Sequence, residues 1–62
     1  MTAVEMLFDP ELDRLLLRFE GLLRVSRLLE ARGATPDELL EHRRELERVS
    51  RELTGFVRRH AA

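Results

Sequence analysis

This 62-residue sequence contains two histidines and two serines, side chains that could carry metal or nucleophilic chemistry. His42 and His60 lie about five helical turns apart in one predicted helix, too far to bind one metal ion within a chain. Ser26 and Ser50 do not follow the strand–turn–helix elbow that presents a nucleophilic serine. The sequence has no cysteine, so it offers no thiolate. We expect a protein that is not an enzyme and that binds no metal or cofactor.

Arginine supplies the remaining candidate binding chemistry. The 11 basic residues, all arginine, face 12 acidic ones, and the net charge is −1. No general positive field therefore draws the chain to nucleic acid or to an anionic membrane. Arg14, Arg18 and Arg32 share one side of the first predicted helix and form the one candidate strip for phosphate contacts.

Capping residues mark two helices that must position these groups. Asp9-Pro10 predicts a helix start, and Gly33 after Arg32 predicts its end. Thr35-Pro36, with Glu38 as the last residue of a T-x-x-E capping box, predicts the second start. The expected helices cover about 10–32 and 36–59, with a turn at 33–35. Residues 1–8 are an N-terminal arm or helix extension, and residues 9–62 form the hairpin.

Apolar residues recur with a helical period in both segments. In a hairpin turning at 33–35, they meet in layers that run from Leu29 with Leu39 near the turn to Leu12 with Phe56 at the open end. The apolar arcs that we expect to pack comprise Leu12, Leu15, Leu16, Phe19, Leu22, Leu23 and Leu29 in the first helix and Leu39, Leu46, Val49, Leu53, Phe56 and Val57 in the second.

One layer of this predicted core is polar. Ser26 and His42 occupy apolar positions of the pattern, and the hairpin register places them opposite each other. We expect a hydrogen bond between the hydroxyl and the imidazole. The layer would act as a register device, or else His42 would be a ligand or pH sensor. Glu38, one turn before His42, could also pair with it.

The first predicted helix has a second, narrower apolar stripe on its other side, formed by Leu17, Gly21, Val25 and Leu28. Because two helices alone offer little core, we interpret this stripe as a contact with a further protein. The candidate partner-binding residues are Leu17, Val25, Leu28, Arg14, Arg18 and Arg32.

These patterns predict an all-α antiparallel helical hairpin that self-associates, with coiled-coil-like packing, into a homodimeric four-helix bundle. The expected function is a small protein–protein interaction module, such as a regulator, adaptor or antitoxin-like partner. In length and layout the sequence also resembles the Rop-type helical hairpins of plasmids. That resemblance implies, as the alternative, an RNA-binding four-helix bundle that uses the arginine strip. No apolar run is long enough to span a bilayer, so we expect a cytoplasmic protein.

Overall fold

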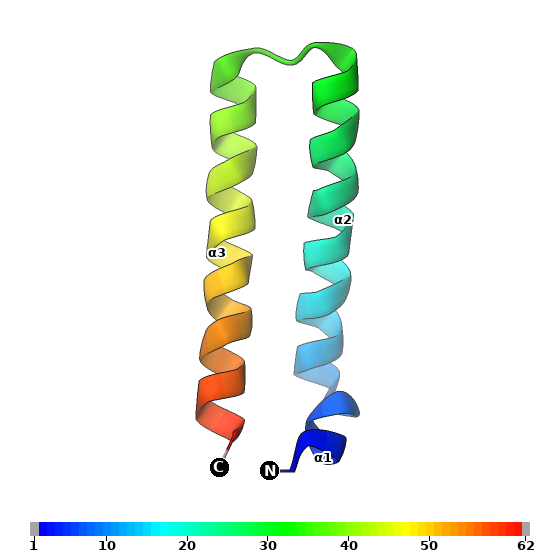
Figure 1. The fold of residues 1–62 in the computed structure, drawn as a ribbon, viewed down its shortest axis with the longest axis vertical. Coiled ribbons are helices and arrows are strands. Elements are labelled where there is room, and N and C mark those ends of the chain that lie inside the picture. The colour runs from blue at the N-terminus through cyan, green and yellow to red at the C-terminus, as the bar shows by residue number, and fades with distance from the viewer. Residues whose placement is uncertain (1, 62) are drawn as a thin grey trace.

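The computed structural model describes residues 2–61, and over that range every regular element is a helix. A short helix α1 (Ala3–Leu7) precedes two long ones, α2 (Pro10–Arg32) and α3 (Pro36–His60). The long helices lie side by side in opposite directions, and both chain ends lie far from the turn (Figure 1). The predicted segments 1–8 and 9–62 include Met1 and Ala62, which lie outside the described residues.

Side-chain caps fix where each long helix begins. The Asp9 carboxylate accepts the backbone N–H of Glu11 at 2.8 Å, and the Thr35 hydroxyl accepts that of Glu38 at 3.3 Å. Each contact satisfies a donor that has no partner in the first helical turn. The Glu38 carboxylate lies 3.8 Å from the Arg32 guanidinium across the turn, so it serves an ion pair and not the second half of a capping box.

The turn depends on the backbone conformation of Gly33. This residue has φ 75° and ψ 41°, the left-handed region that glycine adopts without a steric penalty. The N–H of Gly33 bonds the Glu30 carbonyl at 3.2 Å, and that of Ala34 bonds the Leu29 carbonyl at 2.9 Å. These two bonds close a Schellman motif, which ends α2 and lets α3 begin within three residues.

Within the predicted N-terminal arm or helix extension, residues 3–7 form a short helix that is separate from α2. The Thr2 hydroxyl accepts the Glu5 N–H at 3.2 Å and donates to the Glu5 carboxylate at 3.0 Å. A T-x-x-E signal, the same as at Thr35, therefore stands at the start of α1 and could have predicted it. The Asp9 cap starts α2 as a new helix.

The core is a single seam, the line of side chains along which α2 and α3 touch. Leu12, Val49 and Phe56 are buried, and all lie at the middle or open end of the hairpin. The other seam residues are half-buried and recur at alternating steps of three and four, as in a coiled coil. They are Leu15, Phe19, Leu22, Ser26 and Leu29 in α2 and Leu39, His42, Leu46 and Leu53 in α3.

Three residues of the expected apolar arcs lie outside this seam. Leu16, Leu23 and Val57 remain 42%, 40% and 43% exposed. This exposure is what the arcs imply for a single hairpin, because an apolar arc that covers more than the seam positions needs a second neighbouring helix to cover it. Each long helix of the hairpin has only one such neighbour.

The molecule is accordingly a rod. Its extents are 43 × 15 × 12 Å and its radius of gyration is 14.1 Å, against about 11 Å for a compact chain of this length. Among residues 2–61, no helix combines the length and the apolar character that crossing a membrane requires.

The turn generates a matched pair of tests. Replacing Gly33 with alanine should destabilise the protein by about 1 kcal/mol, because a Cβ is strained at positive φ. Gly21→Ala, inside α2 with open space around the new Cβ, should instead stabilise by about 0.5–1 kcal/mol. Urea denaturation at one protein concentration measures both. A Gly33→Ala protein as stable as the parent would contradict the role assigned to the turn.

Candidate protein-binding surface

One side of the hairpin, the ionic edge, carries the charged pairs that join the two long helices. Its residues on α2 are Glu11, Arg18 and Arg32. Its residues on α3 are Glu38, Glu45 and Arg59. Arg18 bonds Glu45, while the Arg32–Glu38 and Arg59–Glu11 pairs are longer, at 3.8 and 3.9 Å. Within each helix, consecutive members of the set stand seven or fourteen positions apart. Each set therefore forms one straight column along a coiled-coil-like helix.

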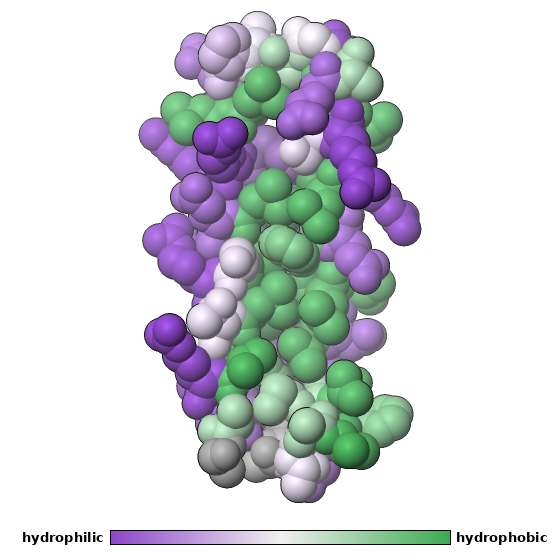
Figure 2. All heavy atoms as spheres, in the orientation of Figure 1, coloured by the Kyte–Doolittle hydropathy of each residue, from purple (hydrophilic) through white to green (hydrophobic). Residues whose placement is uncertain are grey.

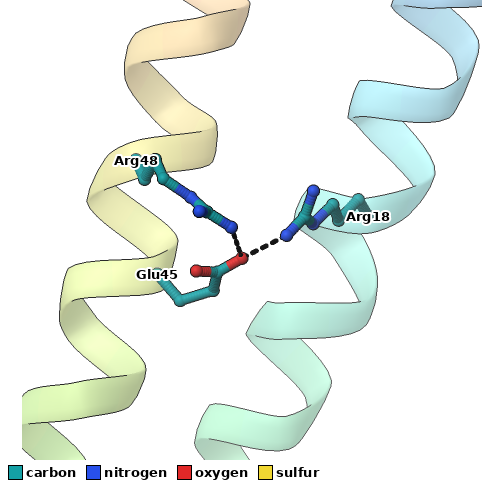
Figure 3. Close-up of polar contacts among 3 residues, drawn as sticks. All are labelled: Arg18, Glu45 and Arg48. Carbon is teal, nitrogen blue, oxygen red and sulfur yellow. Dashed lines mark hydrogen bonds and ion pairs between the residues drawn. The ribbon is translucent and has the colours of Figure 1, made fainter.

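Glu45 is the centre of the ionic edge. One oxygen of its carboxylate accepts hydrogen bonds from Arg18 of α2 and from Arg48, the latter at 2.6 Å (Figure 3). The bond from Arg48, supported by that from Arg18, lowers the pKa of the Glu45 carboxyl below its ordinary value of 4.5. Partial desolvation opposes this shift but does not cancel it. Glu45 therefore links the two long helices through a carboxylate whose ionised form is favoured by both arginines.

The opposite side of the seam, the open face, has no such cover. On α2, Leu16 and Arg18 are two positions apart, so they point about 200° apart around the helix. Arg43 and Glu45 of α3 are related in the same way. Steps of seven from these starting points define the two columns of the open face. They are Leu16, Leu23 and Glu30 on α2, and Arg43, Ser50 and Val57 on α3.

An apolar band runs between the two helices from the open end of the hairpin toward the turn, where polar side chains interrupt it, and more polar side chains flank it (Figure 2). At the open end of the hairpin the band forms a shallow hollow with an almost wholly apolar lining. Its walls are Leu12, Leu16, Leu53, Thr54, Val57 and Arg58.

A second hollow lies on the same face beside the turn, and its lining is mixed. Glu30 of α2 and Arg43 of α3 stand at its two rims. Ser26, Leu39, His42 and Leu46 form its floor. The open face thus changes along its length, from apolar at the chain ends to charged at the turn.

The outer stripe predicted on the first helix is exposed. Leu17 and Leu28 are 60% and 68% exposed, and Val25 is 42% exposed. Val25 stands seven residues from both Arg18 and Arg32, so it belongs to the column of the ionic edge and not to the line of Leu17 and Leu28. The stripe is therefore narrower than the sequence pattern indicates, and its role as a contact for a second protein stays a prediction.

The three arginines of the predicted strip differ in their neighbours. Arg18 bonds Glu45 and Arg32 lies beside Glu38, both acids of α3. Arg14 is exposed. A phosphate that approached this strip would compete with carboxylates for two of its three guanidinium groups, which weakens the RNA-binding alternative.

His42, one of the two residues of the predicted polar layer, makes a different hydrogen bond from the expected one. The Nε2 atom of His42 lies 2.6 Å from the Leu22 carbonyl oxygen of α2, and it must donate because a carbonyl only accepts. Within the described residues no hydrogen bond joins His42 to Ser26, so that expectation is wrong. Both residues are half-buried beside the second hollow. The sequence could not reveal this bond, because its acceptor is a backbone carbonyl that every residue possesses.

The second histidine packs within its own helix. The His60 ring stacks on Phe56 with 4.1 Å between ring centroids, and its Nδ1 donates to the Phe56 carbonyl at 2.9 Å. Over residues 2–61, no three histidine or acidic side chains gather closely enough to hold a metal ion. The open face is the surface on which exposed apolar side chains of both long helices adjoin an apolar hollow.

Comparison with protein-family models, with curated proteins and with solved structures finds no match to this chain. The function must consequently be argued from the surface of the hairpin itself.

The ionic edge predicts a specific acid sensitivity. Because the pKa of Glu45 is lower in the folded state than in the unfolded chain, the carboxyl stabilises the fold above its ordinary pKa of 4.5. That stabilisation is lost as the pH falls through the lower folded pKa. Thermal melts of Glu45→Gln at pH 7 and pH 3 should show a smaller loss of melting temperature than the parent. Equal losses in both proteins would contradict this role.

Proposed function

We propose that this chain is a non-enzymatic protein–protein interaction module that self-associates through its open face into a homodimeric four-helix bundle. The single observation that carries the proposal is the apolar band on that face, with Leu16, Leu23 and Val57 each about two-fifths exposed. Soluble proteins rarely leave a band of this kind uncovered unless it binds another protein.

The exposed area supports the same proposal. The chain exposes 5023 Å², whereas a compact monomer of 7.3 kDa exposes about 4200 Å². The excess of about 800 Å² per chain equals what each partner of a standard protein interface buries. A second helical pair laid over the open face gives each long helix the second neighbour that its apolar arc requires.

In such a bundle, the outer side of α2 stays available. Leu17 and Leu28 lie away from both the seam and the open face, and they are the most exposed leucines of α2. They are the proposed contact through which the dimer engages a further protein as a regulator or adaptor. Such a contact places an apolar stripe of one helix against a helix or groove of a partner.

Sedimentation equilibrium at micromolar concentration tests the proposal directly, with a dimer expected. Leu23→Glu places an unpaired charge in the proposed interface and should shift the protein to monomer. Leu17→Glu is the matched control, because it makes the same change in the same helix outside the open face, and it should remain dimeric. A monomeric parent protein, or equal dissociation in both variants, would overturn the proposal.

A further inference from the structure

We propose that two copies pack with their turns at the same end, so that α2 of each chain lies over α3 of the other. This inference rests on the proposed self-association and adds the orientation of the two chains. It follows from how polar and apolar residues are distributed along the open face.

The two columns of the open face form three layers. Leu16 of α2 and Val57 of α3 line the apolar hollow at the open end, and Glu30 and Arg43 line the mixed hollow at the turn. Leu23 and Ser50 stand between these two ends. Each lies seven residues from the residue above it and seven from the residue below it in its own column. The face is therefore apolar at one end and bears one acid and one base at the other.

A twofold axis can bring two such faces together in two ways. If the axis runs along the helices, the turns lie at the same end. Glu30 of each copy then lies over Arg43 of the other, and Leu16 lies over Val57. The two charges of each chain are paired as they lose water, and the apolar ends cover each other.

If the axis runs across the helices, the turns lie at opposite ends and each helix lies over its own copy. Glu30 then lies over Leu16, and Arg43 lies over Val57. The four charges of the dimer would lose water against side chains of the other copy that carry no opposite charge, which is unfavourable for each ion. The charge pattern therefore selects the same-end arrangement.

Spin labels can distinguish the two arrangements. Because the sequence has no cysteine, a single introduced cysteine gives one label per chain. Ala34→Cys places the label at the turn, eleven residues beyond Leu23. In the opposite-end dimer the two labels would differ in height by roughly 33 Å, at 1.5 Å per residue. In the same-end dimer they stand at one height, separated only by the width of the bundle. Glu47→Cys, near mid-height on α3, is the control and should give a short distance in either arrangement.

Double electron–electron resonance on each labelled protein then has three outcomes. Short distances from both sites support the same-end dimer. A short distance from Glu47→Cys with a long one from Ala34→Cys overturns the orientation and leaves the proposed self-association standing. The absence of dipolar coupling from both sites overturns the self-association as well.

Mixing oppositely charged variants gives an independent test. Glu30→Arg and Arg43→Glu each place like charges opposite each other in a same-end homodimer, whereas a mixed dimer of the two pairs every charge. Native mass spectrometry should show the mixed dimer above its statistical proportion. Glu41→Arg mixed with Arg44→Glu makes the same charge changes outside the open face and should give the statistical proportion. Equal proportions in both mixtures would overturn the same-end inference.

Discussion

The apolar arc of each long helix is wider than one neighbouring helix can cover, and this constraint governs the rest of the structure. The hairpin buries Leu12, Val49 and Phe56 and half-buries the remaining seam. It leaves Leu16, Leu23 and Val57 at the edge. A chain of this size has little core to spare, and burial of apolar surface is its main source of stability. Association is therefore the physical consequence that we propose for the uncovered face.

The two flanks of the seam have different chemistry, and that difference gives the hairpin its two sides. On the ionic edge, Glu45 receives Arg18 and Arg48, so polar groups close that flank within one chain. Exposed ion pairs contribute little stability individually. Their larger effect is to keep that flank unattractive to apolar surfaces, which leaves the open face as the side suited to a second helical pair.

Much of the fold is readable from the sequence because it depends on local signals. Asp9, Thr35 and Gly33 act at the positions where capping and turn chemistry predict them. The sequence left residues 1–8 as an arm or a helix extension, although Thr2 and Glu5 carry a capping signal for the separate helix α1. The candidate surface was less predictable, since an apolar arc does not reveal which of its members a single neighbouring helix will cover. The bond from His42 to the Leu22 carbonyl left no trace in the pattern of side chains.

In the proposed assembly, a second copy of the chain covers the open face of the hairpin. The most direct measurement is the thermal midpoint, followed by circular dichroism, as a function of protein concentration. If folding and association are coupled, mass action requires the midpoint to rise steadily as the protein is concentrated from the low micromolar to the millimolar range. A cooperative melt whose midpoint is the same at every concentration would show a hairpin stable on its own, and would contradict the account.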